Sequence, residues 1–335
     1  MKEQRISLAH GDGGDLAHKL ILDIFVSQFG NKAEATMDSA LLELPVQNIA
    51  FTTDSFVVKP IFFPGGNIGK LAVAGTVNDL AVAGAKPIFM STAFIIEEGF
   101  LVSDLKTIVK SMAEEAGKVG IKIVAGDTKV VERGSADGVF INTTGLGVIQ
   151  PPGQLNPLKI KKDDVVIVSG PIGDHGIAIL TARGELGIQS TVKSDCASLS
   201  NMINKIMDNC QELRIMRDPT RGGLATTLVE ICEDFNVTIQ LEEERIPIRD
   251  TVHGACDILG FDPLYLANEG KVIIICSSEE EEKVLSYLKQ HSEGEEAVAI
   301  GKVQSNDRGQ LLLQTPLGTT RRLHRLSGMM LPRIC

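Results

Sequence analysis

The sequence predicts an α/β (α+β) chain that is divided into two domains. Its 335 residues are too many for one small core. Segments with the periodicity of strands and of helices alternate in both halves. A stretch with three prolines and a glycine, residues 150–157, separates the halves and is typical of a domain boundary. We therefore predict domains at 1–150 and 158–313, and a mobile tail at 314–335 that carries Cys335.

The first half contains a regular succession of elements. Apolar residues at intervals of three and four, followed by Gly30, predict a helix over 16–30. Small residues fill the predicted helix 69–85, so this helix can lie close to a sheet. Ser103 is the predicted cap of a helix over 103–119. The predicted strands are 48–58, 88–96, 121–125 and 139–149, and the third of them runs directly into Gly126-Asp127-Thr128-Lys129.

The second half repeats the mixture of strands and helices. A strand at 165–169 leads through the loop 170–176 into a helix. Further helices are predicted near 196–213 and at 224–235 and 279–290. The remaining strands are predicted at 236–241, 271–276, 296–303 and 310–313. Residues 314–335 show no strong periodicity, so we expect them to be extended.

Composition excludes several classes of protein. The net charge is −10 and there is no long basic run, which argues against nucleic acid as a partner. No uncharged apolar run is long enough to span a membrane, and the N-terminus lacks a signal peptide, so we expect a soluble cytoplasmic protein. The six cysteines show no CxxC spacing and are expected to be free thiols, five of them buried.

The last residue, Cys335, is the exception among the cysteines. Chain ends are usually mobile, so a terminal thiol can move to a site and leave again. This placement suits a covalent carrier; the alternative is a leftover thiol on a frayed end.

Aspartates form the main candidate for a metal and phosphate site. Several of them end a predicted strand, lie in an apolar helix or neighbour a glycine, where a buried carboxylate needs a cationic partner. Abundant aspartate suits Mg²⁺, which prefers oxygen ligands and accompanies nucleotide phosphates. A helix cap or a turn is the alternative at each position. The candidate metal ligands are Asp38, Asp54, Asp79, Asp127 and Asp218.

Other polar residues have two possible interpretations each. The cluster His10-Gly11-Asp12-Gly13-Gly14 can cradle phosphate or form an ordinary turn, and it matches neither a Walker loop nor a dinucleotide fingerprint. Glu269 can act as a general base or pair with Lys271 in a turn. Lys129 can neutralise phosphate or lie in solvent, and His175 can be catalytic or a hydrogen-bonded loop residue.

The chain resembles a family of hydrogenase maturation factors, the HypE carbamoyl dehydratases, within the aminoimidazole ribonucleotide synthetase-like ATP-dependent enzymes. The resemblance extends over essentially the whole length. One departure is Asp12, where the family usually has serine. The motifs that carry it are His10–Gly14, Thr53-Asp54-Ser55, Gly75–Ala85, Gly126–Lys129, Gly173–Gly176, Arg217–Gly223, Asn268-Glu269-Gly270 and the terminal Pro332-Arg333-Ile334-Cys335.

The resemblance implies a two-domain fold whose N-terminal domains pair into a shared β-barrel in a homodimer. It implies ATP and Mg²⁺ between the domains, with Cys335 as the carrier of a carbamoyl group received from HypF. Dehydration gives a thiocyanate, and the cyanide passes to iron on HypC–HypD for [NiFe] hydrogenase. Cys335, Glu269 and Lys129 are then the catalytic residues. The nucleotide-binding residues are His10, Gly11, Gly13, Gly14, Asn78, Thr128 and Arg221.

Two other functions remain open at this point. A related ATP-dependent kinase or synthetase of the same fold, such as a selenophosphate synthetase or a thiamine-monophosphate kinase-like protein, phosphorylates a free small molecule and needs no terminal cysteine. Selenophosphate synthetases also carry a reactive residue near the N-terminus, whereas this chain has no cysteine before Cys196. The second alternative is a non-catalytic scaffold that docks maturation partners through its tail.

Overall fold

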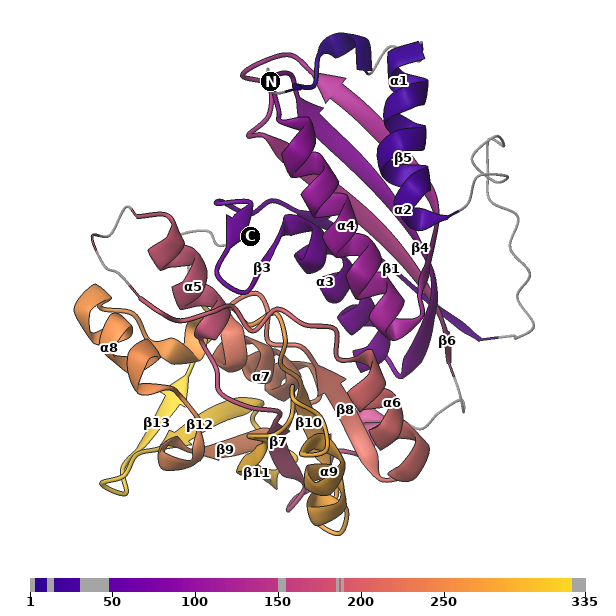
Figure 1. Ribbon diagram of the computed structural model, residues 1–335. Helices are drawn as coiled ribbons and strands as arrows, with labels where there is room; N and C mark the ends of the chain where they lie inside the picture. Colours follow the sequence, from indigo (N-terminus) through magenta and orange to yellow (C-terminus); the bar gives the residue numbers. More distant parts are fainter. Residues whose placement is uncertain are drawn as a thin grey trace.

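A computed structural model of the chain describes residues 4–10, 15–30, 48–149, 155–184, 187 and 190–326. Within these segments no helix combines the length and the apolar character that crossing a membrane requires. The described residues form two units, an N-terminal unit with a four-stranded sheet and a C-terminal unit with a seven-stranded sheet (Figure 1). The predicted α/β class and the two-part organisation are therefore confirmed.

The N-terminal unit is built on a sheet with the strand order β1-β6-β4-β5. The strands β4 and β5 are parallel, and the other pairs are antiparallel. A short hairpin, β2 and β3, leads into α3. The bounds are β1 Ile49–Phe56, β2 Phe62–Phe63, β3 Gly66–Asn67, α3 Ile68–Val82, β4 Ala85–Glu97, α4 Val102–Val119, β5 Lys122–Val131 and β6 Val139–Ile149.

A short helical segment precedes this sheet and confirms the predicted helix over 16–30. It begins as α1 (Asp15–Leu20), continues as the π-helical turn η2 (Ile21–Val26) and ends as α2 (Ser27–Phe29). Gly30 follows with φ of 84°, a left-handed conformation that suits the predicted stop residue. Phe25 packs against Phe94 of β4 with ring centroids 4.9 Å apart, which attaches the segment to the core. The 3₁₀ turn η1 (Leu8–His10) lies before it.

The C-terminal unit has the strand order β13-β12-β9-β11-β7-β10-β8, with the buried strand β7 near the middle. Its strands are β7 Val165–Val168, β8 Leu213–Arg217, β9 Thr238–Glu242, β10 Ile273–Cys276, β11 Val298–Ser305, β12 Gln310–Gln314 and β13 Thr320–Leu323. Its helices are η4 Pro157–Lys159, α5 Asp174–Ala182, α6 Ser200–Asn209, α7 Gly223–Asp234, η5 Glu243–Arg245, α8 Asp250–Leu259, η6 Pro263–Tyr265 and α9 Glu281–Leu288.

Helix α3 joins the two units. It contacts β1, β6 and α4 of the first unit, and α6 and β8 of the second. Asn67 caps it by accepting hydrogen bonds from the amides of Gly69 and Lys70. Small residues let the helix pack closely, and a side chain at Gly69 would collide with the carbonyl oxygen of Ile108 on α4. Along its whole length only Lys70 and Asp79 are not buried.

Several local predictions are corrected by the structure. Leu101, not Ser103, occupies the N-cap of α4, without a side-chain hydrogen bond. The helix expected near 196–213 is shorter and covers only Ser200–Asn209. Residues 213–217 form the strand β8. The sequence did not reveal this strand because its Arg214 is charged, and it is buried only because it pairs with Asp164 at 2.9 Å. The tail expected from residue 314 is wrong for residues 320–323, which form β13 on the edge of the sheet.

Candidate active site

Three of the predicted aspartates lie together where the two units meet. Asp54 is on β1, Asp79 is near the end of α3, and Asp218 follows β8. Thr52 donates a hydrogen bond to Asp79 Oδ2 at 2.9 Å, and Arg221 Nη2 of the second unit lies 3.3 Å from Asp54 Oδ1. We call Asp54, Asp79 and Asp218 the acid group. These side chains lie far apart in the sequence and are brought together by the fold.

Electrostatics confirm that the acid group is crowded with negative charge. Burial raises the pKa of Asp218 to about 6, and the nearby charge of Asp79 contributes to this shift. Burial also raises the pKa of Asp79, although the hydrogen bond from Thr52 lowers it; the charge of Asp54 raises it further. The guanidinium groups of Arg221 and Arg217 act in the opposite direction on Asp79 but do not reverse the shift. The acid group is therefore suited to a ligand that brings positive charge.

The donor set fits Mg²⁺ accompanied by a phosphate. Carboxylate oxygens are the ligands that Mg²⁺ prefers, and it usually keeps water or phosphate oxygens as well. Within the described segments no three acidic, histidine or cysteine side chains are close enough together to hold a metal ion unaided. Oxygen atoms of a bound phosphate would have to complete the coordination. Asp38, the remaining predicted ligand besides Asp127, lies outside the described residues.

Asp127, Thr128 and Lys129 are not brought to the acid group within one chain. They lie inside β5 and not at a strand end, because β5 pairs with β4 as far as Val131. The strands β1 and β5 are opposite edges of the sheet, separated by β6 and β4, which places them about 14 Å apart. Asp127 and Lys129 are exposed, and Thr128 is half-buried.

Glu269 is held beside the acid group by its neighbours. Asn268 is fully buried, its amide nitrogen Nδ2 donates to the carbonyl of Pro219 at 3.1 Å, and its Oδ1 accepts from Gly173 at 2.7 Å. This fixes Glu269 next to the loop that carries Asp218. The backbone amide of Glu269 donates to Asp195 Oδ1 at 3.0 Å, and its side chain is nearly buried at 8% exposure. A carboxylate so enclosed has the setting of a general base.

Asn78 supports this arrangement from the first unit. Its Nδ2 donates to the carbonyls of Ala197 at 3.0 Å and Glu269 at 3.4 Å, and its Oδ1 accepts from the amide of Leu199 at 2.8 Å. The side chain is 2% exposed. These bonds use both donors and one acceptor position of the amide. Its amide therefore makes contacts between the two units, and the predicted role of Asn78 in nucleotide binding stays a prediction.

Two histidines were considered for the site. His10 uses Nδ1 in contacts with the amide and hydroxyl of Ser7, at 3.1 Å and 2.9 Å. His175 is fully buried at the start of α5, with Nδ1 2.8 Å from Ser194 Oγ. Burial lowers its pKa to about 4, so the ring is neutral at pH 7 and supports the segment 194–199. Gly11, Asp12, Gly13, Gly14 and Cys335 lie outside the described residues.

Cysteine chemistry is excluded at the five described positions. All five are buried, as predicted: Cys196, Cys210, Cys232, Cys256 and Cys276. The pKa of the Cys196 thiol is raised strongly by burial and further by the charge of Glu269. A thiol held protonated in this way is a poor nucleophile.

Sequence reasoning missed some contributors to the site. Thr52 and Arg217 act directly on Asp79, and Asp195 positions the backbone of Glu269. Arg217 directly precedes Asp218 in the motif Arg217–Gly223, and this position could have identified it as a neighbour of the candidate metal ligands. Asp195 gave none, because its partner Glu269 lies 74 residues away.

Two family models match the chain, one in each unit. The family description "AIR synthase related protein, N-terminal domain" matches residues 36–149, and the corresponding C-terminal domain matches residues 161–314. "Carbamoyl dehydratase HypE" of Rhodobacter capsulatus is 45% identical, with 100% of this chain and 99% of the relative covered.

Two solved structures extend the comparison. "Hydrogenase Maturation Protein HypE in complex with ATP" has a TM-score of 0.93 and 43% identity, with 98% of this chain and 99% of that chain covered. A "HypE-HypF complex" has a TM-score of 0.80 and 47% identity, with 93% and 100% covered.

The raised pKa of Asp218 predicts how replacement of this residue affects stability. Its native pKa of about 6 exceeds the value of 3.8 for the free side chain. The charged carboxylate therefore costs stability above about pH 6, and this cost disappears below about pH 4. Asp218→Asn should raise the free energy of unfolding by about 1–3 kcal/mol near pH 7 and have little effect near pH 4.

The measurement is urea unfolding of both proteins across this pH range. Asp208→Asn on the exposed side of α6 is the matched control, and it should change stability by only a few tenths of a kcal/mol. A loss of stability near pH 7 in Asp218→Asn would contradict the proposed crowding of charge.

Proposed function

The chain belongs to the HypE family of carbamoyl dehydratases, and on this premise we propose that it uses ATP to dehydrate an S-carboxamide on Cys335 to a thiocyanate. The observation that carries the proposal is the full-length match to this family together with a cysteine at the last position of the chain. The cyanide group would then serve as an iron ligand of a [NiFe] hydrogenase.

The acid group is the proposed place of the ATP phosphates. A relative of 43% identity has been solved in complex with ATP, which supports a nucleotide site in this fold. Asp54, Asp79 and Asp218 would hold the Mg²⁺ that accompanies the phosphates, and this ion would offset their negative charge. Arg221 lies at the same place and can contact a phosphate oxygen once it leaves Asp54. His10–Gly14 and Thr128 remain predicted nucleotide contacts.

The chemistry requires that the amide oxygen become a better leaving group. Attack of this oxygen on the γ-phosphorus breaks the bond to ADP and forms an O-phosphorylated intermediate. Loss of phosphate then breaks the carbon–oxygen bond as the nitrogen gives up its two protons and the carbon–nitrogen triple bond forms. The carboxamide oxygen leaves in phosphate, one proton stays on the phosphate, and the other goes to solvent. Sulfur keeps its bond to carbon throughout.

Glu269 is the proposed base for the nitrogen protons. Its side chain is nearly buried, and its neighbour Asn268 is bonded to Pro219, the residue after Asp218, so the backbone at Glu269 lies close to the acid group. Proton removal by a positioned carboxylate contributes about 10²–10⁴-fold to rate. Lys129 is the proposed group that stabilises negative charge on the transferred oxygen.

The described part of the C-terminal segment favours delivery of Cys335 to this place. Tyr265 donates a hydrogen bond to the carbonyl of His324 at 2.9 Å, and Arg325 forms an ion pair with Glu233 at 2.6 Å. The amide of Leu326 donates to Thr226 Oγ1 at 3.3 Å, near the start of α7, which directly follows Arg221 and Gly222. Nine residues follow Leu326 in the sequence, and a fully extended chain of that length spans about 30 Å. In this proposal residues 327–335 are the part of the chain that carries Cys335 to the acid group.

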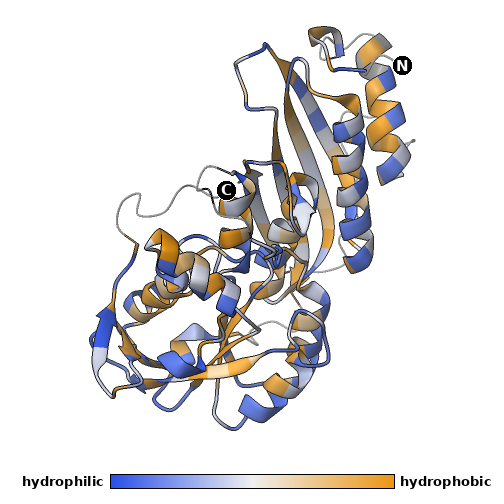
Figure 2. Cartoon of the chain, turned by 60° about the vertical axis from the view of Figure 1, so that its left-hand side comes forward, coloured by the Kyte–Doolittle hydropathy of each residue, from blue (hydrophilic) through white to orange (hydrophobic). Residues whose placement is uncertain are grey.

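A homodimer would complete the active site. The sheet face away from α3 exposes apolar side chains, with Phe51 69% exposed and Ile49 and Ile95 each 44% exposed. Figure 2 shows hydrophobic residues interspersed with hydrophilic ones along the strands of this sheet. The edge strands β1 and β5 have no further strand beside them in the described chain. If two sheets closed into an eight-stranded barrel, β5 of one protomer would adjoin β1 of the other and place the strand that carries Lys129 next to the strand that carries the partner's Asp54.

Two further partners are part of the proposal. The relative solved as a HypE–HypF complex supports HypF as the carbamoyl donor. The family supports HypC–HypD as the acceptor of the cyanide group. A cytoplasmic location, where these partners would be met, stays a prediction.

Intact-mass analysis tests the proposed reaction. After incubation with HypF and its substrates, the wild-type protein should gain the mass of a carbamoyl group and then, with ATP, lose the mass of one water. Cys335→Ser should gain no carbamoyl mass. Glu269→Gln should accept the group but lose water at least about 100-fold more slowly. Cys256→Ala is the matched control and should behave like the wild type. A carbamoyl adduct on Cys335→Ser would exclude the carrier role.

Mixed dimers test the shared active site. Glu269→Gln and Lys129→Gln homodimers should each be inactive. Mixing equal amounts with exchange of protomers should restore about a quarter of wild-type activity, because half of the dimers are mixed and each mixed dimer has one intact site. If both residues acted within a single chain, every site would keep one defect and activity would stay at the level of the parent variants.

A further inference from the structure

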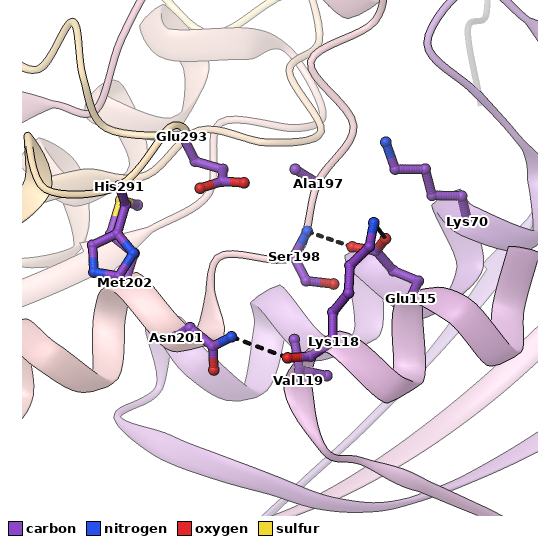
Figure 3. Close-up of a pocket in the computed structure, with 10 residues that line it drawn as sticks. All are labelled: Lys70, Glu115, Lys118, Val119, Ala197, Ser198, Asn201, Met202, His291 and Glu293. Carbon is purple, nitrogen blue, oxygen red and sulfur yellow. Dashed lines mark hydrogen bonds and ion pairs between the residues drawn. The ribbon is translucent and has the colours of Figure 1, made fainter.

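A second hollow lies between the two units, away from the acid group. It is a groove of about 400 Å³ between α4 and Lys70 of the first unit and α6 and the loop after α9 of the second (Figure 3). This volume is within the range of small-molecule sites, which often occur where domains meet. Lys70 and Asp79 are the two residues of α3 that are not buried, and nine residues of helix separate them by about 13 Å. The groove is thus distinct from the acid group.

The wall on the first unit is basic. Figure 3 shows Lys70, Glu115 and Lys118 together on this side. The Glu115 carboxylate is nearly buried and is already satisfied, since it pairs with Lys118 Nζ at 2.8 Å and accepts from the amide of Ser198 at 3.0 Å. This pairing uses one of the three protons of the Lys118 ammonium group, whose side chain remains 62% exposed. Lys70 Nζ contacts only a backbone carbonyl, that of Gly65 at 3.2 Å, among the described residues.

The wall on the second unit carries the opposite charge. Glu293 and His291 face the groove from the loop after α9, on the side opposite the lysines (Figure 3). In the described parts of the chain Glu293 takes part in no ion pair. Its charge raises the pKa of Lys118, together with the stronger effect of Glu115, which indicates that the two walls interact electrostatically across the groove. The groove is therefore polar at both ends and has opposite charges on its two sides.

The lining of the groove suits a small polar ligand better than a nucleobase. The lining contains no phenylalanine or tyrosine on which a base could stack. It offers instead short polar groups, the side chain of Ser198 in the segment 194–199 and that of Asn201 on α6. Asn201 Nδ2 donates to the carbonyl of Lys118 at 3.1 Å, which holds α6 against the end of α4.

We propose that this groove binds a small zwitterionic metabolite of amino-acid type, with its anionic group at Lys70 and Lys118 and its ammonium group at Glu293. Such a ligand contacts both units at once. The ligand thereby stabilises the relative position of the units. The segment 194–199, which lines the groove with Ala197 and Ser198, also forms hydrogen bonds with Asn78 and Glu269. Ligand binding at the groove therefore favours the arrangement that the active site requires.

The test uses the full-length protein and the common amino acids, one at a time, with inorganic phosphate as a probe that carries only negative charge. Thermal shift identifies a binder and isothermal titration calorimetry measures its affinity. At least one amino acid should bind, and both Lys70→Gln and Glu293→Gln should weaken it about tenfold or more. Lys106→Gln, an exposed position on α4, is the matched control and should leave the affinity unchanged.

Two results would overturn the proposal. One is that no amino acid binds to the wild-type protein. The other is that phosphate binds as well as any amino acid and Glu293→Gln has no effect, which would make the groove a simple anion site. Because Lys70 and Glu293 lie at the surface of the groove and outside the core, the melting temperature of each unliganded variant should stay close to that of the wild type.

Discussion

The buried amide of Asn78 is the interaction on which the active-site arrangement depends. It lies on the helix α3, which is packed into the first unit, and its three hydrogen bonds go to Ala197, Leu199 and Glu269 of the second. Each bond to a buried backbone group is worth about 1 kcal/mol when present, and leaving such a group unsatisfied costs about 1–3 kcal/mol. These bonds fix the position of one unit relative to the other. In this position Asp79, the residue after Asn78 in α3, lies beside the loop that carries Asp218.

The charges at this junction explain why the site is suited to a phosphate-bearing ligand with a metal ion. Burial and mutual repulsion raise the pKa of both Asp79 and Asp218, so the isolated chain carries a cost that a bound cation can remove. Arg217 at the end of β8 and Arg221 in the following loop offset this cost at Asp79 only in part. The charged carboxylates of Asp79 and Asp218 therefore lower the stability of the fold, but the proposed binding of a cation requires these charges. Such a balance is common at active sites.

Much of the fold could be predicted from the sequence, because α4 has a clear apolar period, small residues mark α3, and the strands are rich in apolar residues. The strand β8 could not, since its buried Arg214 depends on Asp164, which lies 50 residues away. The strand β13 carries two exposed arginines and reads as a polar tail. The motif aspartates were identified, but the sequence could not show that Asp54, Asp79 and Asp218 meet while Asp127 lies on the opposite edge of the sheet. That separation depends on strand order, which no local pattern encodes.

Native-state hydrogen exchange on Asn78→Ala tests the central claim most directly. If the amide holds the units together, exchange at Leu199 should become at least about tenfold faster, because its N–H loses the Oδ1 acceptor of Asn78, and exchange at Glu269 should rise as well, because the carbonyl of that residue loses the Nδ2 donor. The amides that pair β4 with β6 should keep their protection. Unchanged exchange at Leu199 and Glu269 in this variant would contradict the account.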